Sequence, residues 1–283
     1  MNNKKNMIIT GVTGQDGLFL CSQLLTENNL NFIYGFTRDT ENKEFFKRIN
    51  YLNKEIDVKK IRLIDSKYLL HQNLSSLFNE IKPDYIFNMS GPSSVYESLE
   101  NPQNAKKIED IFLNLISACL KNNLKPNFFQ ASSSEMFGKV KENLLNENTS
   151  FNPNSPYALS KLNVHNKVKE LRIEHEWPIV SGIMFNHESE FREEKYLFMK
   201  IINYVIKTKK NEVDGPLSLG SLKFRRDWSY AKDISEAVIM MMRSENNKDY
   251  VLGSGKSHSI QDIVEIIFGI FDLNWRKYIN IEK

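Results

Sequence analysis

Short apolar runs alternate with longer stretches of helical periodicity as far as residue 185. The runs predict six β-strands, at residues 7–10, 32–36, 61–64, 85–89, 127–132 and 178–185. Between them, apolar residues recur every three or four positions, which predicts amphipathic helices. Strands that alternate with helices are typical of βαβ units. The pattern therefore predicts the α/β class, with a doubly wound parallel sheet.

The alternation loosens after residue 185, and this change marks the predicted domain boundary. We expect residues 1–185 to form the doubly wound domain. Residues 186–283 should form mainly a smaller lobe, with some segments that return to the first domain. The clearest predicted loop is "NENTSFNPNSP" at 146–156, because it is rich in Asn, Pro and Ser.

Charge and cysteine content exclude several classes of function. The 283 residues carry 38 Lys and Arg against 35 Asp and Glu without a basic block, so we expect neither a nucleic acid nor a membrane as partner. Cys21 and Cys119 are isolated within apolar helical patterns, which indicates buried thiols rather than a metal site or a disulfide. The sequence has no run of about 18 apolar residues and no signal-peptide core, so we expect a soluble, cytoplasmic protein.

The first predicted strand runs into the turn "GVTGQDG" at 11–17, which leads into a helix. Glycines spaced in this way let the backbone approach a pyrophosphate at a helix N-terminus. Three glycines alone also fit a purely structural turn, but the strand before and the helix after favour a dinucleotide, as in Rossmann folds. We assign to the cofactor site Gly11, Thr13, Gly14, Gln15, Asp16 and Gly17.

The second predicted strand ends in "FTRDT", and its charged pair bears on the choice of cofactor. Arg38 can pair with a ribose 2′-phosphate, which would select NADP. Asp39 can instead accept a hydrogen bond from a free 2′-hydroxyl, which would select NAD. A solvated surface pair is a third interpretation. We expect NADP, with Arg38 in the cofactor site, and keep NAD as the alternative.

Two further motifs combine into a candidate catalytic group. The fifth strand ends in "QASSSEMFG", and ligands collect at the carboxyl ends of parallel strands, so Ser133 and Glu135 should face a ligand. "SPYALSK" places Tyr157 and Lys161 on one helix face, where an ammonium can lower the pKa of a phenol that acts as a base. Each motif alone also fits a serine cap or an ordinary helix face. The two motifs together, with the glycine turn and a proline at the start of a helix, indicate a catalytic site much more specifically than either motif alone.

With these residues the chain resembles a known family. The extended short-chain dehydrogenase/reductases share the glycine spacing and the Tyr-Lys pair. Within them, the chain is similar to the GDP-mannose 4,6-dehydratases along almost its whole length. The matching stretches outside the glycine turn and the Tyr-Lys motif are "FQASSSEMFG" at 129–138, "GIMFNHES" at 182–189, "RRDWSYAKD" at 225–233 and "LNWRKYI" at 273–279.

The resemblance implies a chemical role for each of four residues. Tyr157 would remove the proton of the sugar 4-hydroxyl while hydride passes to the nicotinamide, whose ribose Lys161 would hold. Glu135 would take the C5 proton and protonate the departing 6-hydroxyl, so that water leaves and the returning hydride gives a 4-keto-6-deoxy sugar. Ser133 stands where the family usually has threonine, and either hydroxyl can hydrogen-bond the sugar 4-oxygen.

The resemblance also implies binding residues outside the catalytic group. Asn186, Lys200 and Arg226 match positions that meet the sugar nucleotide. Ser93 is assigned to the substrate and His187 to the cofactor. Without the resemblance, Asn186 would be interpreted as a loop cap and the two cations as solvated charges.

The chain departs from the family pattern in four places. "SGPSSV" at 90–95 has Pro92 and Ser94 where the family has a glutamine and a histidine. "SKYLL" at 66–70 follows the third strand, so Lys67 replaces the acidic residue expected near the adenine. Residues 190–192 replace a proline and paired arginines of an interface loop. The chain stops at Lys283, where relatives continue through a segment that closes the substrate lobe. We therefore expect a C-terminally shortened substrate-binding lobe, with an open pocket or a wall supplied by partner chains.

The resemblance thus implies an NADP-dependent lyase that dehydrates GDP-mannose or a related GDP-hexose. It also implies a homodimer or higher homo-oligomer, formed through helices at 105–123 and 156–175. One alternative is an epimerase or reductase, which shares the Tyr-Lys pair but has no need of Glu135. Another is a non-catalytic dinucleotide-binding protein, which the altered adenine region would fit. The presence of Glu135 favours elimination.

Overall fold

The computed structural model describes residues 4–139 and 144–282. The chain divides into two compact units. The first unit comprises residues 1–185 and 231–252, and the second comprises 186–230 and 253–283. The first unit contains one sheet and the second contains two, and each unit has its own apolar core.

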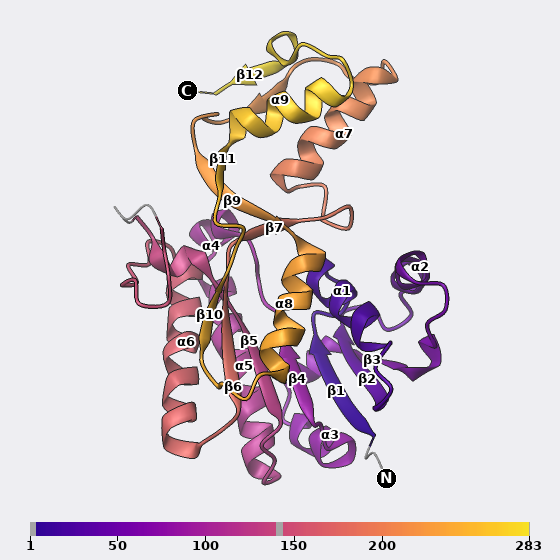
Figure 1. Ribbon diagram of the computed structural model, residues 1–283, viewed down its shortest axis with the longest axis vertical. Coiled ribbons are helices and arrows are strands. Elements are labelled where there is room, and N and C mark those ends of the chain that lie inside the picture. Colours follow the sequence, from indigo (N-terminus) through magenta and orange to yellow (C-terminus); the bar gives the residue numbers. More distant parts are fainter. Residues whose placement is uncertain (1–3, 140–143, 283) are drawn as a thin grey trace. The chain divides into compact units, whose positions relative to one another are not determined.

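A seven-stranded sheet forms the centre of the first unit, with the strand order β10-β6-β5-β4-β1-β2-β3 (Figure 1). Every neighbouring pair is parallel. Parallel strands buried on both faces read as continuous apolar runs, which is why the six predicted strands are all present and differ only at their ends. The strands are β1 (Lys5–Thr10), β2 (Leu30–Thr37), β3 (Ile61–Asp65), β4 (Tyr85–Asn88), β5 (Asn127–Ser133), β6 (Ile179–Met184) and β10 (Asp249–Leu252).

Helices cover both faces of this sheet, which confirms the predicted doubly wound class. One layer contains α1 (Gln15–Leu24), α2 (Lys43–Leu52) and α8 (Ala231–Arg243). The other contains α3 (Leu74–Ile81), α4 (Val95–Glu100), α5 (Pro102–Lys121) and α6 (Pro156–His175). Short 3₁₀ turns are η1 (Val58–Lys60), η2 (Ser66–Leu70) and η3 (Ser134–Phe137). Beneath α5, Phe112 meets Phe128 of β5 edge to face, with ring centroids 5.9 Å apart.

The strand order reverses between β1 and β4, and in open α/β sheets such a switch point is where ligands bind at the carboxyl ends of the strands. Gly11 leaves β1 with a φ of 68°. A Cβ atom at this position would lie 3.3 Å from the Cα of Ser90, which follows β4. The turn after β1 and the loop after β4 therefore pack backbone against backbone.

The second unit has two small sheets and three helical segments. One sheet has the order β11-β9-β7 and the other pairs β12 with β8. Its core lies between α7, α9 and the strands, and includes Ile201, Val264 and Phe268. The elements are β7 (Asn186–Glu188), α7 (Leu197–Lys209), β8 (Leu217–Leu219), β9 (Arg225–Tyr230), β11 (Ser257–Ser259), α9 (Ile260–Ile270), η4 (Trp275–Lys277) and β12 (Ile279–Ile281).

Substitution of Gly138 should destabilise the first unit. Gly138 ends η3 with a φ of 63°, and a Cβ atom there would lie only 1.8 Å from the carbonyl oxygen of Asn152. We expect Gly138→Ala to lower the free energy of unfolding by about 2–4 kcal/mol, measured by urea denaturation. Gly269→Ala is the control, because Gly269 lies in α9 with no atom within 4 Å of its added Cβ. It should be neutral or stabilise by up to about 1 kcal/mol; equal losses in the two variants would contradict the steric argument.

Candidate functional site

The glycine turn after β1 permits a close backbone approach that only glycine allows. A Cβ atom on Gly17 would lie 2.4 Å from the carbonyl oxygen of Gly11 and 2.6 Å from the Cα of Val12. Gly14 is the N-cap of α1, so no side chain caps the first turn of this helix. Thr13 joins the turn to the end of β2, since its hydroxyl lies 3.2 Å from that of Thr37. The turn thus offers an open helix N-terminus bounded by β1 and β2.

The two charged residues after β2 differ in their hydrogen bonds. The backbone N–H of Asp39 donates to the Thr37 hydroxyl (3.3 Å), and its carboxylate accepts from the N–H of Glu41 (3.0 Å). Asp39 therefore stabilises its own turn. Arg38 is exposed, and no residue in the described ranges forms a hydrogen bond or ion pair with its guanidinium.

An acidic residue does end the third strand. Asp65 is the last residue of β3, and its carboxylate accepts from the N–H of Lys67 at 2.9 Å. The Lys67 ammonium pairs with the same carboxylate, also at 2.9 Å. The substitution seen in the sequence at Lys67 thus leaves a carboxylate two residues earlier, at the carboxyl edge of the sheet.

The end of β5 presents Ser133 and Glu135 from a firmly held turn. The Ser133 hydroxyl accepts from the N–H of Glu135 at 3.2 Å and caps η3, so the alternative interpretation of this serine as a cap is borne out. The hydroxyl can still donate its own proton. Met136 and Phe137 are fully buried and anchor the turn. Glu135 is half-buried, and none of the described residues forms an ion pair with it.

Tyr157 and Lys161 lie on the first two turns of α6. The helix begins as predicted, with Pro156 at its first position and the Ser155 hydroxyl accepting from the N–H of Ala158 (3.1 Å). Both Tyr157 and Lys161 are buried, and the Lys161 Nζ lies 5.8 Å from the centroid of the Tyr157 ring. The predicted shared face is therefore directed into the first unit.

Lys161 is a cation held in a buried place. Its ammonium donates to the carbonyl oxygen of Ala131 on β5 at 2.8 Å. Burial lowers the pKa of Lys161 to about 8, although the negative charge of Asp16 opposes this effect. The glycine turn, the end of β5 and α6 therefore meet around one ammonium.

The next residue along this face of α6, His165, is one that the sequence analysis missed. It is fully buried, and its Nδ1 lies 2.9 Å from the Ser181 hydroxyl, which is 2.8 Å from that of Ser132. Burial lowers the pKa of His165, although the Asp249 carboxylate, 3.4 Å from its Nε2, opposes this effect. The sequence signal for His165 is its spacing, because residues 157, 161 and 165 are four positions apart and lie on the same face of a helix.

The other predicted substrate and cofactor residues lie on several elements. Ser93 is exposed in the loop before α4 of the first unit. In the second unit, Asn186 and His187 lie on β7, which pairs with β9. The Lys200 ammonium on α7 donates to the carbonyl of Ser218 (3.1 Å), and the exposed Arg226 guanidinium on β9 donates to the carbonyl of Arg225 (3.0 Å). No described contact joins Lys200 to Arg226.

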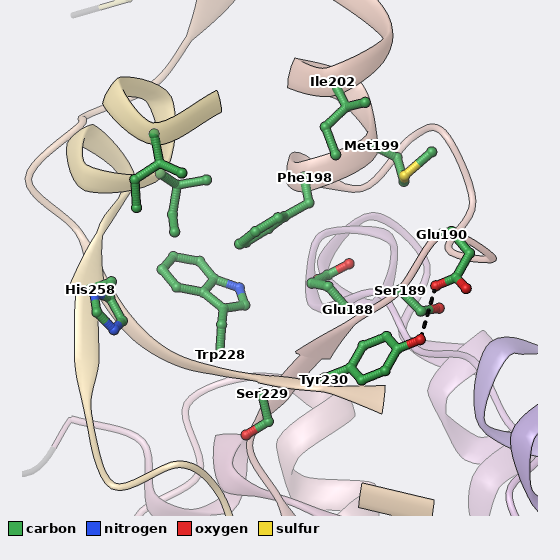
Figure 2. Close-up of a pocket in the computed structure, with 12 residues that line it drawn as sticks. Glu188, Ser189, Glu190, Phe198, Met199, Ile202, Trp228, Ser229, Tyr230 and His258 are labelled. Carbon is green, nitrogen blue, oxygen red and sulfur yellow. Dashed lines mark hydrogen bonds between the residues drawn. The ribbon is translucent and has the colours of Figure 1, made fainter. Parts of the chain in front are cut away.

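The second unit contains a largely apolar pocket of about 500 Å³ (Figure 2). Trp228 of β9 and Phe198 of α7 are in edge-to-face contact in its lining, with ring centroids 5.4 Å apart. At one end the Tyr230 hydroxyl donates to the Glu190 carboxylate at 3.4 Å. An apolar lining with a few polar groups is typical of small-molecule sites. The apolar lining consists of Phe198, Met199, Ile202, Trp228, Ile263 and Ile266.

Comparison with known proteins identifies the family. The sequence model of GDP-mannose 4,6 dehydratase matches residues 8–282. The chain belongs to this family. GDP-mannose 4,6 dehydratase 1 of Arabidopsis thaliana is 32% identical over 99% of the chain and 78% of its own length. The human GDP-mannose 4,6 dehydratase is 33% identical over 95% of the chain and 73% of its length.

Solved structures share the fold at lower identity. The UDP-glucose 4-epimerase of Thermus thermophilus, solved in complex with NAD, is 18% identical with a TM-score of 0.81. The alignment covers 97% of this chain and 85% of the epimerase. The predicted resemblance to the GDP-mannose 4,6-dehydratase family and the predicted fold class are both confirmed.

The glycine turn of this family member fits the pyrophosphate of a dinucleotide. Gly17 lets α1 pack directly against the backbone of Gly11 and Val12, and the N-terminus of α1 has no side-chain cap. The Ser90 hydroxyl beside Gly11 is buried and has no hydrogen-bond partner among the described residues. A ligand that brings anionic oxygens to this place would satisfy these groups.

In the described ranges, no group of three or more His, Cys, Asp or Glu side chains could hold a metal ion. None of the described helices is long and apolar enough to cross a membrane. Cys21 and Cys119 are buried as predicted, and burial raises the pKa of Cys119 to about 12.

Removal of the buried ammonium should stabilise the protein without cofactor. The pKa of Lys161 falls from 10.5 to about 8 on folding, so burial penalises the ammonium below pH 8 and no longer does so above about pH 10.5. We expect Lys161→Met to raise the free energy of unfolding by about 1–3 kcal/mol at pH 7, with a gain that fades between pH 8 and pH 10.5. Denaturant unfolding at pH 7 and pH 10 measures both effects.

The matched control is Lys207→Met, because Lys207 is exposed on α7. It should change the unfolding free energy by less than about 0.5 kcal/mol at either pH. A Lys161→Met protein that is less stable than the wild type at pH 7 would show that the bond to the Ala131 carbonyl outweighs the cost of burial.

Proposed function

We propose that this family member is a nucleotide-sugar 4,6-dehydratase that acts on GDP-mannose or a related GDP-hexose. One observation carries the proposal. In a single unit, the buried Tyr157 and Lys161 lie on α6, the Lys161 ammonium donates to a carbonyl of β5, and Glu135 follows the end of that same strand. Neither an epimerase nor a reductase needs a carboxylate at this place, whereas elimination requires a base for the C5 proton.

The four residues of the candidate catalytic group divide the proton transfers between them. Tyr157, whose ring lies beside the Lys161 ammonium, takes the proton of the sugar 4-hydroxyl. Ser133 donates a hydrogen bond to the 4-oxygen. Glu135 takes the C5 proton, which the 4-keto group has made acidic, and passes it to the departing 6-hydroxyl, so that water leaves. A bound nicotinamide dinucleotide would accept the hydride from C4 and return it to C6, and the proton that Tyr157 took from the 4-hydroxyl would be delivered to C5.

The cofactor residues are proposed on the same basis. The turn residues Gly11, Gly14 and Gly17 would meet the pyrophosphate, with their neighbours Thr13, Gln15 and Asp16, and Lys161 would meet the nicotinamide ribose. His187 is proposed as a further cofactor contact. We infer that NADP is preferred over NAD, because Arg38 has no described partner while Asp39 is engaged in its own turn.

We further infer that Asn186, Lys200 and Arg226 bind the diphosphate and nucleoside of the substrate, and that Ser93 contacts the sugar. The support is their match to the family motifs and the cationic side chains of Lys200 and Arg226, which suit a diphosphate. Self-association through α5 and α6 and a cytoplasmic location stay predictions. The exposed Leu113, Leu120 and Leu159 on these helices are compatible with an interface.

The cofactor preference can be tested with Arg38→Ala. Loss of a charge-assisted contact to the 2′-phosphate should weaken NADPH binding about 10- to 100-fold and leave NADH binding unchanged, measured by nucleotide fluorescence. Arg48→Ala is the control, because Arg48 pairs with Glu44 on α2 and should not affect either cofactor. Equal weakening of NADPH and NADH, or of neither, would remove Arg38 from this role.

The reaction can be tested by incubating the protein with NADP and GDP-mannose. We expect the sugar nucleotide to lose the mass of one water, detected by mass spectrometry, with no net change in the amount of NADP or NADPH. An isomer of unchanged mass would indicate an epimerase. Stoichiometric consumption of NADPH would indicate a reductase, and no conversion of any GDP-, UDP- or dTDP-hexose would contradict a catalytic function.

Glu135→Gln tests the assigned base in the same assay. The amide cannot take the C5 proton, so turnover should fall by at least about 10²-fold while NADPH binding is retained. Glu80→Gln, at an exposed position on α3, is the matched control and should keep full turnover. Wild-type turnover by the Glu135→Gln protein would assign the elimination to another base.

A further inference from the structure

Three buried polar side chains form a hydrogen-bonded row across the sheet of the first unit. Thr10 ends β1, Asn88 ends β4, and Gln130 lies on β5; the three are direct neighbours in register. Each is at most 1% exposed. The Thr10 hydroxyl donates to the Asn88 Oδ1, and the Asn88 Nδ2 donates to the Gln130 Oε1, both at 2.8 Å.

The direction of every bond in this row follows from the backbone at one end. The Thr10 Oγ1 accepts from the N–H groups of Met89 and Ser90, both at 3.0 Å, so its two lone pairs are used and its proton goes to Asn88. Asn88 must then present its oxygen to Thr10 and its NH₂ group to Gln130. Gln130 in turn has one satisfied orientation, in which its NH₂ group points onward along the row.

The row ends on the carbonyl that holds the buried ammonium. The Gln130 Nε2 donates to the carbonyl oxygen of Ala131 at 2.9 Å, and the Lys161 Nζ donates to the same oxygen at 2.8 Å. The registered pairing of β4 with β5 ends at Gln130, one residue earlier. The Ala131 carbonyl is therefore shared between an amide N–H and an ammonium.

We propose that Gln130, oriented by Asn88 and Thr10, is a positioning residue for Lys161. The Gln130 amide holds the Ala131 carbonyl in place and uses one of the two lone pairs of its oxygen. The Lys161 ammonium is therefore oriented by this carbonyl, but its hydrogen bond to the shared oxygen is weaker than a bond to an unshared one would be. The two other N–H donors of Lys161 then remain for a bound ligand and for Tyr157. The inference rests on the proposed function in giving Lys161 a catalytic role.

The row also connects two parts of the candidate site. Thr10 directly precedes Gly11 of the glycine turn, and Ser90, whose N–H bonds to Thr10, packs against that glycine. The charged and titratable groups near the ammonium are Asp16 from the turn and the Tyr157 phenol from α6. The position of the turn and the state of Lys161 are thus set through the same buried contacts.

The test is a titration of Lys161 in the full chain without cofactor or sugar. Lysines labelled with ¹³C at Cε are followed by NMR from pH 6 to pH 11, and the Lys161 signal is assigned by its absence in Lys161→Met. In Gln130→Met, which keeps the side-chain length, the ammonium becomes the only side-chain donor to the Ala131 carbonyl. We expect the titration midpoint to rise by about 0.5–1 pH unit and NADPH binding to weaken about 3- to 10-fold.

A second variant separates orientation from local packing. Asn88→Leu leaves Gln130, Ala131 and Lys161 intact, but removes the bond that orients the Gln130 amide. Asn88→Leu should also raise the titration midpoint of Lys161, by less than Gln130→Met does. If Gln130→Met does not fold, the result with Asn88→Leu tests the inference. The control is Asn122→Ala, which deletes hydrogen bonds to Ser75 and Ala118 and should leave the midpoint unchanged.

An unchanged Lys161 midpoint and unchanged NADPH binding in a folded Gln130→Met or Asn88→Leu protein would overturn the inference. Both measurements are made without a sugar nucleotide, so they give a result even if the protein does not dehydrate GDP-mannose. Conversely, dehydration with an unchanged midpoint in the variants would support the proposed function and remove the positioning role of Gln130.

Discussion

The burial of a parallel sheet between two helical layers is the constraint on which the rest of the first unit depends. Strands covered on both faces must be apolar, so polar side chains collect where the strands end. All seven strands are parallel, and their carboxyl ends therefore meet at one edge. The glycine turn, Ser133 and Glu135 all leave the sheet at this edge. Among the polar residues that remain inside, Thr10, Asn88 and Gln130 form hydrogen bonds with one another.

The proposed chemistry requires a cation where burial disfavours one. Lys161 keeps its place because the Ala131 carbonyl accepts from it and Asp16 attracts it, yet its pKa is still lowered to about 8. A site of this kind costs stability that a purely structural helix would not lose. The same low-dielectric surroundings strengthen the influence of the ammonium on the Tyr157 phenol. Burial of the Lys161 ammonium therefore both lowers the stability of the protein and strengthens the effect of this ammonium on Tyr157.

The second unit is built on different principles. Its sheets are small, and an apolar core around α7 and α9 holds the strands in place. The pocket lined by Trp228 and Phe198 is largely apolar, whereas the residues that match the family's sugar-nucleotide motifs are polar, and two of them donate to backbone carbonyls. Apolar contact can accommodate many ligands, so the direction of polar groups has to supply the selectivity.

Local sequence patterns determined six of the strands in the large sheet, the start of α6 at Pro156 and the glycine turn, since helix spacing and steric room at glycine act within a few residues. The shared face of Tyr157 and Lys161 follows from the same periodicity. The tertiary structure alone decided the place of β10, the turn that occupies Asp39, and the row through Thr10, Asn88 and Gln130. The bonds of this row join residues 78 and 42 positions apart, and only the order of the strands brings them together. Long-range register, which no local pattern encodes, therefore sets the direction in which Lys161 is held.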